Sequence, residues 1–270
     1  MTAVNLVRII SVILLTLLLA EPFGVAYASG QDCAAVTQEQ PARIDSIAAR
    51  GEFNLADGRK IRPLGIVIMQ SSILPGMIER QLPIWRGRDI DLAHLSPHPD
   101  RWGRHSSWAA TPSIMAGHDP LPVTLALLQD GVGLADPSEV PLDCRKTLLK
   151  AEADARRGKR GIWRDGEEMM INANTPAGSV RQRSGQFSVM EGRVLRVGEG
   201  RQRNFIDFGT RGSGAASGAI PRRNMAMVLP SGIKLADLKG KRLRMRGVLE
   251  WQLDRPFMLL DTVAMIEVLD

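Results

Sequence analysis

Four histidines are the first candidates for chemistry, because imidazole binds metals and transfers protons near neutral pH. They are His94, His98, His105 and His118. Pro97 between the first pair and Pro99 just after it keep these two histidines from sharing a helix face, and no cysteine or clear carboxylate set completes four zinc ligands. A serine hydrolase can be drawn from His105 and Ser106, but no nucleophile-elbow motif supports it. We therefore expect histidines in solvated loops and no metal site.

Basic side chains are the second candidates, since 35 Lys and Arg against 29 Asp and Glu give a net charge of +6. Such a chain suits nucleic acid, acidic lipid or acidic polysaccharide, and equally plain solubility. Four of residues 156–160 are basic and lie at a predicted helix C-terminus. The helix dipole favours cations there, so this cluster does not by itself indicate a ligand. Arg242, Arg244 and Arg246 alternate with apolar residues along a predicted strand, whose face could follow a phosphate backbone or be plain exterior. Aromatic residues make up only 4%, which argues against many base-stacking platforms.

Residues 1–28 have the pattern of a secretory signal peptide. Arg8 gives a basic start, residues 9–20 are mostly apolar, and Ala26-Tyr27-Ala28 is a small-x-small cleavage pattern. The run is short for a membrane span, which takes about 20 residues, so an uncleaved anchor is the weaker alternative. No later segment is apolar for long enough to span. We expect a mature protein without a stable membrane span, secreted or periplasmic.

Two cysteines occur, Cys33 just after the predicted cleavage point and Cys144 far downstream. In an oxidising compartment an even pair favours one disulfide, and the alternative is two buried thiols. A bridge closing a loop of about 110 residues would stabilise the fold by a few kcal/mol.

Three patterns predict the elements that would position a site. Phe53 and Leu55 precede the turn residues Asp57-Gly58, and a second apolar run follows, which predicts a β-hairpin. Residues 138–163 contain the best helix pattern. Strand patterns over residues 187–197, 204–209, 243–251, 256–260 and 264–269 predict a second, all-β half.

Four blocks resemble the thermonuclease, or staphylococcal-nuclease-like, family, in the family's order, between residues 44 and 165. They are Leu-Ala-Asp-Gly-Arg-Lys-Ile-Arg-Pro-Leu-Gly-Ile at 55–66, Asp-Arg-Trp-Gly-Arg at 100–104, Leu-Leu-Gln-Asp-Gly-Val-Gly-Leu-Ala at 127–135, and Ala-Glu-Ala-Asp-Ala-Arg-Arg-Gly-Lys-Arg-Gly-Ile-Trp at 151–163. The resemblance implies a mainly β (α+β) fold. An OB-type five-stranded barrel with about three helices would span residues 33–168. Residues 169–185 would be a linker, and residues 186–270 a small OB-like β domain like that of periplasmic relatives.

The family hydrolyses DNA and RNA with calcium, using carboxylates around the metal and two arginines that clamp the phosphate. The resemblance places the two arginines at Arg62 and Arg104. It places the two metal aspartates at Gly51 and Val67, and the water-orienting glutamate at Gln70. The arginines are retained, either to bind an anion or to pack and form salt bridges around an old pocket.

The replaced positions argue against catalysis. Gly51 and Val67 offer no anionic oxygen to calcium, and Gln70 cannot take a proton from water. Glu52 is one residue from the lost aspartate, but alternation along a strand would aim it the other way. Loss of the general base alone typically lowers the rate of such a reaction by a factor of about 10²–10⁴.

The sequence therefore predicts a secreted, thermonuclease-like pseudoenzyme of the cell envelope that binds nucleic acid or another polyanion, with no cofactor. The alternative is an active secreted nuclease with a rebuilt calcium site. The identity of a protein partner is left open.

Overall fold

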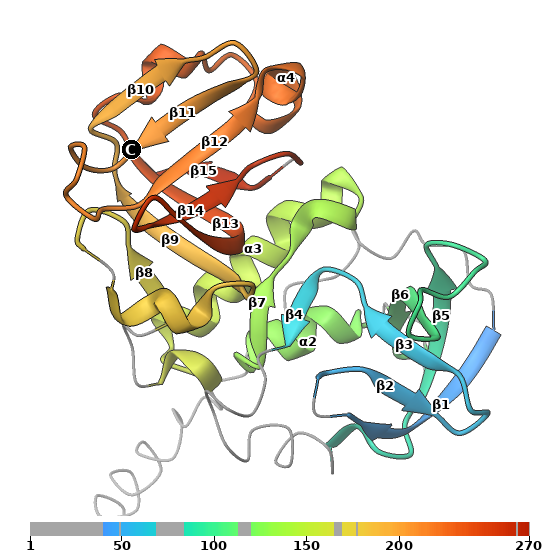
Figure 1. Ribbon diagram of the computed structural model, residues 1–270. Helices are drawn as coiled ribbons and strands as arrows, with labels where there is room; N and C mark the ends of the chain where they lie inside the picture. Colours follow the sequence, from blue (N-terminus) through green and yellow to red (C-terminus); the bar gives the residue numbers. More distant parts are fainter. Residues whose placement is uncertain are drawn as a thin grey trace, which may run out of the picture.

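The computed structural model describes residues 40–48, 50–68, 84–112, 120–164, 169–176, 178–262 and 264–269 (Figure 1). The predicted signal peptide, Cys33, Gln70 and His118 lie outside the described residues. The disulfide and the secreted location therefore stay predictions, while Cys144 is 1% exposed within a helix. Among the described helices, none has both the length and the apolar character needed to cross a bilayer.

The first domain is built on a closed five-stranded barrel, which confirms the mainly β, OB-type fold expected from the sequence. Its strands close in the order β1-β2-β3-β6-β5. They are β1 (Gln40–Ile47), β2 (Phe53–Leu55), β3 (Lys60–Pro63), β5 (Asp89–His94) and β6 (Arg104–Ala110). The β3–β6 pair is parallel and the other pairs are antiparallel.

The predicted hairpin is confirmed as β2 and β3. Phe53 pairs with Ile61 across the hairpin, and both side chains are completely buried in the barrel. Gly58 has a φ of +89°, which a glycine adopts without the Cβ penalty of other residues. The Asp57 carboxylate accepts a hydrogen bond from the Arg59 amide at 3.0 Å and so fixes the turn.

Two helices cover the barrel on the side that faces the second domain (Figure 1). They are α2 (Val123–Gln129) and α3 (Leu142–Arg157), which pack against each other. Between the two domains, β4 (Ile66–Ile68) pairs with β7 (Gly133–Ala135) as a separate two-stranded sheet. Three 3-10 segments, η2 (Pro137–Glu139), η3 (Gly161–Trp163) and η4 (Gly178–Arg183), lie in the connections.

The second domain is one eight-stranded sheet with the order β10-β11-β12-β14-β13-β9-β8, and β15 pairs with β13. Its strands are β8 (Met170–Asn172), β9 (Phe187–Arg193), β10 (Arg196–Glu199), β11 (Arg203–Asp207), β12 (Ser217–Pro221), β13 (Arg242–Gln252), β14 (Arg255–Leu259) and β15 (Ile266–Val268). The short helix α4 (Met225–Val228) and the 3-10 segments η5 (Arg222–Asn224) and η6 (Leu235–Leu238) complete it. The stretch 169–185, predicted as a linker, carries β8 and η4.

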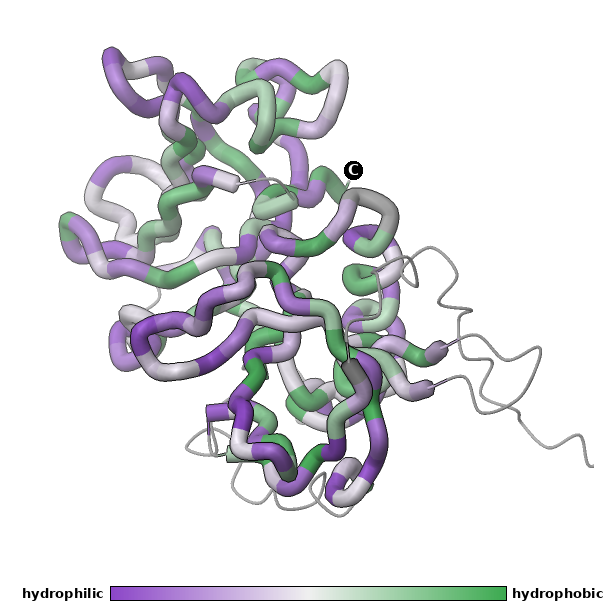
Figure 2. The backbone as a smooth tube through the Cα atoms, turned by 90° about the vertical axis from the view of Figure 1, so that its right-hand side faces the viewer, coloured by the Kyte–Doolittle hydropathy of each residue, from purple (hydrophilic) through white to green (hydrophobic). Residues whose placement is uncertain are grey.

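Apolar side chains fall into two buried clusters, one for each domain. Hydrophobic and hydrophilic stretches follow one another along the backbone, as the tube in Figure 2 shows. Exposed and buried residues alternate along strands such as β3 and β11. The clusters meet at β8 and β9, because Val189 of β9 belongs to the first cluster and Met190 to the second. The two domains therefore share packed apolar surface.

A buried ion pair joins the two domains at the same place. Arg246 of β13 donates to the Glu152 carboxylate of α3 at 3.0 Å and to the Ala135 carbonyl oxygen at 2.8 Å. It also donates to Glu267 of β15 at 2.6 Å. The Arg246 and Glu152 side chains are each 1% exposed.

The protonation states of this pair are fixed by its surroundings. Burial raises the pKa of the Glu152 carboxyl, but Arg246 outweighs it and the pKa falls below its ordinary value. Burial lowers the pKa of Arg246, but Glu152 and Glu267 outweigh it and the pKa rises. Both groups are therefore charged at neutral pH.

Removing one partner of this pair should cost much more than removing an exposed arginine of the same strand. Arg246→Ala takes from the buried Glu152 carboxylate its main guanidinium partner and leaves only Arg156 at 3.3 Å, and we expect it to lower the free energy of unfolding by about 3 kcal/mol, the low end for breaking a buried pair. Arg242→Ala, at a side chain 57% exposed, should cost under about 1 kcal/mol. Urea denaturation of both variants measures the difference, and equal costs would contradict the assignment.

Candidate functional site

The two arginines that the resemblance assigns to a phosphate clamp lie on neighbouring strands of the barrel. The parallel register of β3 and β6 sets Arg62 opposite Ser106 and Lys60 opposite Arg104. Side chains two residues apart on a strand share a face, so Arg62 and Arg104 share one. Ile61, between Lys60 and Arg62, is buried in the barrel, so the arginines lie on the outer face.

Arg104 is held by two carboxylates. Its Nε donates to Asp100 at 2.9 Å and its Nη1 donates to Glu52 at 3.0 Å. The guanidinium also lies 4.7 Å from the ring centre of Trp102, a side chain that is 53% exposed. Burial raises the pKa of the Asp100 carboxyl, but hydrogen bonds from the Arg104 side chain and from backbone amides outweigh it and lower the pKa to about 2.

Arg62 is also occupied by side chains of the protein. Its Nη2 donates to Ser106 Oγ at 2.7 Å and forms an ion pair with Glu139 of η2. Counting the two acids on Arg104, three carboxylates contact two guanidinium groups. Of the two interpretations open from the sequence, packing and salt bridging therefore fits this face better than an open anion clamp.

The two positions at which the resemblance expects metal-binding aspartates carry no carboxylate. Gly51 has a φ of +83°, and a Cβ built on it would lie 2.5 Å from the Cβ of Ile68. Val67 lies in β4 opposite Leu134 of β7. Among the described residues, no group of three or more His, Cys, Asp or Glu side chains converges as a metal site would require.

Glu52 and Gly51 face different neighbours, as alternation predicts. A Cβ on Gly51 would point at Ile68, whereas the Glu52 carboxylate contacts Arg104. Glu52 is therefore on the same face as the arginines and away from the Gly51 position.

The expectation of loop histidines is wrong for two of the four. His94 ends β5 and His105 lies in β6, and their rings stack with centroids 4.5 Å apart. His94 Nδ1 lies 2.6 Å from the hydroxyl of Ser107, which is completely buried. Sequence reasoning missed this because strand pairing, which sets Ser107 opposite His94, brings the rings together. His98 is in an exposed turn, as expected.

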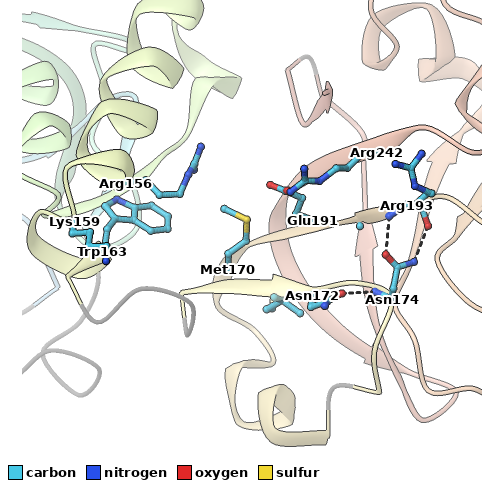
Figure 3. A pocket seen from close by; sticks show the side chains of 11 residues that line it. Arg156, Lys159, Trp163, Met170, Asn172, Asn174, Glu191, Arg193 and Arg242 are labelled. Atoms are coloured by element: carbon cyan, nitrogen blue, oxygen red, sulfur yellow. Dashed lines mark hydrogen bonds and ion pairs between the residues drawn. The ribbon is translucent and has the colours of Figure 1, made fainter. Parts of the chain in front are cut away.

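A cleft of about 700 Å³ lies between the C-terminal end of α3 and the sheet of the second domain. Figure 3 shows Arg156, Lys159 and Trp163 on one side of it. Glu191 and Arg193 of β9 and Arg242 of β13 lie on the other side. Met170 lies between the two sides, and Asn172 and Asn174 lie in the lower part of the view. Four of the lining side chains are cationic and one is a carboxylate.

The single acid of the cleft is already shared between arginines. Glu191 forms ion pairs with Arg242 and, at 2.7 Å, with Arg244. Lys159 is exposed, and within the described part of the chain its ammonium group has no hydrogen-bond or ion-pair partner. The cleft therefore carries a surplus of positive charge.

Arg156 lies on the α3 side of the cleft, beside one carboxylate and one aromatic ring. Its Nη1 lies 3.3 Å from Glu152, and its guanidinium lies 5.4 Å from the ring centre of Trp163. Burial lowers the pKa of Arg156, and the positive charge of Arg244 lowers it further. An anion bound beside Arg156 would relieve both effects.

Backbone contacts fix the far wall of the cleft. The Asn174 side chain donates to the Arg193 carbonyl oxygen and accepts from the Arg193 amide, both at 2.7 Å (Figure 3). This amide clamp holds the strand end that carries the Arg193 side chain. Such rigid support favours binding, because less conformational freedom is lost when a ligand arrives.

The sequence indicated parts of the cleft but not the cleft itself. The basic run 156–160 and the alternating arginines of β13 are visible in the sequence, but they lie on different domains, and only the fold brings them to one cleft. The strand face of Arg242, Arg244 and Arg246 is not an open phosphate track, because Arg244 is 12% exposed and Arg246 is 1% exposed.

Comparison of the sequence with models of protein families and with curated proteins finds no match.

The Gly51 position should resist any side chain, and Gly58 provides a matched control. Both glycines have positive φ, but a Cβ on Gly58 would meet nothing within 4 Å. Gly58→Ala should cost about 1 kcal/mol through its backbone alone. Gly51→Ala should cost roughly 1–3 kcal/mol more, because overpacking against Ile68 is added. Chemical denaturation compares the two, and similar costs would show that the position is open to a ligand side chain.

Proposed function

We propose that this chain is a thermonuclease-like protein that has lost hydrolysis and binds a polyanion, with nucleic acid as the representative ligand. The observation that carries the proposal is the interdomain cleft, where Arg156, Lys159, Arg193 and Arg242 face a single acid, Glu191. Phosphate groups along a nucleic acid strand supply the charge that this cleft lacks.

Loss of hydrolysis is supported by the positions that would carry it. Gly51 and Val67 offer no metal ligand, and the space beside Gly51 is filled by Ile68. The alternative of an active nuclease with a rebuilt calcium site gains nothing from Glu52, whose carboxylate contacts Arg104. The pattern of residues 1–28 further supports an action outside the cytoplasm, secreted or periplasmic.

Binding through the cleft rather than the old clamp follows from how the arginines are occupied. Arg62 and Arg104 are each bound to carboxylates, so an incoming phosphate would have to displace them. In the cleft, an incoming phosphate would meet Lys159 without displacing a described partner. Affinity in such a site should fall steeply with salt, because bound counterions are released.

The salt dependence of binding tests the cleft. Lys159→Gln/Arg242→Gln removes one exposed cation from each side of it, and Glu191, which loses Arg242, keeps its ion pair with Arg244. For a labelled single strand, the slope of log affinity against log salt should decrease in magnitude by about 1.4, or 0.7 for each lost contact. Fluorescence anisotropy of the mature protein between low and moderate salt measures that slope.

Lys146→Gln/Lys150→Gln is the matched control. Both lysines are exposed on α3, the pair removes the same charge, and neither lines the cleft. Its slope should stay at the wild-type value. Equal slopes in the two double variants would mean that binding depends on net charge alone, and the cleft would be excluded as the site.

A further inference from the structure

A second basic surface lies on the far side of the second domain's sheet from its core. Arg203 of β11 and the turn residues Arg222 and Arg223 after β12 line a cavity of about 520 Å³. Asp261 is the acid among its lining residues. The surface therefore has a surplus of positive charge that is separate from the interdomain cleft.

The three arginines of this surface differ from those of the barrel face and of β13. Arg62, Arg104, Arg244 and Arg246 each contact carboxylates. In the part of the chain that the structure describes, the guanidinium groups of Arg203, Arg222 and Arg223 have no hydrogen-bond or ion-pair partner. They are available to an anion without breaking an internal ion pair.

An exposed aromatic ring lies on the same face. Side chains two residues apart on β11 share a face, so Phe205 lies beside Arg203, while Asn204 and Ile206 are buried on the other face. The register sets Phe205 opposite Ala219 of β12, next to Leu259 of β14. Phe205 is 37% exposed. A flat ring beside unpaired cations is the combination that single-stranded nucleic acid binds, with a base on the ring and phosphates on the cations.

Backbone contacts hold the arginines in place. The Arg222 amide donates to the Gln202 carbonyl oxygen at 3.0 Å, which ties the turn to the β10–β11 hairpin. The Asn224 side chain donates to the Asp261 carbonyl oxygen at 2.8 Å, which ties the other end of the turn to β14. The turn is anchored at both ends, so the backbone that carries Arg222 and Arg223 is fixed before a ligand arrives.

We propose that the surface of Arg203, Phe205, Arg222 and Arg223 is a binding site for single-stranded nucleic acid, with one base stacked on Phe205. A duplex does not fit this role, because its bases are stacked inside the helix and present no free face. A polyanion without bases, such as polyphosphate or an acidic polysaccharide, would use the arginines alone. The site is independent of the interdomain cleft and of any binding there.

Paired ligands separate the ring from the charges. The probes are a labelled single-stranded thymidine oligonucleotide and an abasic sugar-phosphate strand of the same length, each titrated into the mature protein. Wild-type protein should bind the oligonucleotide about fivefold or more tightly than the abasic strand, the low end of what one stacked base contributes. Phe205→Ala should remove that preference and leave affinity for the abasic strand unchanged.

Arginine variants test the charges. Arg222→Gln/Arg223→Gln should weaken binding of both strands and flatten the salt dependence of each. Arg86→Gln/Arg211→Gln removes the same charge from exposed positions outside this cavity, and Leu253→Ala removes an apolar side chain that is 90% exposed. Both controls should bind like the wild type and keep the base preference.

Three results would overturn the proposal. They are equal binding of the two strands by the wild-type protein, an equal loss of both strands in Phe205→Ala, and identical binding by the two double-arginine variants. The cleft is tested separately. Lys159→Gln/Arg242→Gln should change the slope of log affinity against log salt, while the preference for the oligonucleotide over the abasic strand stays intact. A failure of the cleft and a failure of this surface are therefore distinguishable.

Discussion

The buried ion pair between Arg246 and Glu152 fixes the position of the second domain against helix α3 of the first. A guanidinium and a carboxylate, each 1% exposed, cannot be separated without leaving a charge in an apolar interior. Because Arg246 belongs to β13 and Glu152 to α3, their contact holds the sheet of the second domain against the helix of the first (Figure 1). The basic cleft lies along this junction, so its shape depends on the pair. The alternating arginines of β13 become more buried along the strand, from Arg242, which lines the cleft, to Arg246 in the interior.

The arginines of this protein fall into two groups, those that are paired with acids of the chain and those on surfaces where cations outnumber acids. On the outer face of the barrel, Arg62 and Arg104 contact acids of the chain itself. In the cleft and on the β11–β12 surface, cations outnumber acids. A net charge of +6 does not distinguish these cases, because an anion is attracted to the places where positive charge is not balanced by nearby acids. The barrel arginines are paired within the chain, whereas the proposed anion sites lie at the domain junction and on the second domain.

Local patterns in the sequence predicted local structure well. Alternation around Asp57-Gly58 predicted the hairpin of β2 and β3, and helix-forming residues predicted α3. The predicted strands of the second half correspond to β9, β11, β13, β14 and β15. What the sequence could not predict are contacts between distant segments. The His94–His105 stack depends on the register of β5 and β6, and the cleft depends on α3 meeting β9 and β13. Whether Arg246 was a surface or an interior residue could not be read from its strand, since alternation places it on a face without saying what covers that face.

We propose that the protein binds a polyanion in the interdomain cleft and on the second domain, and that it does not cut the polyanion. Mature protein incubated with end-labelled single-stranded DNA and calcium, with and without chelator, tests it in one assay read for both complex formation and strand length. The account predicts a complex that weakens with salt and a strand of unchanged length under both conditions. Calcium-dependent shortening of the strand, abolished by the chelator and by Arg104→Ala, would contradict it.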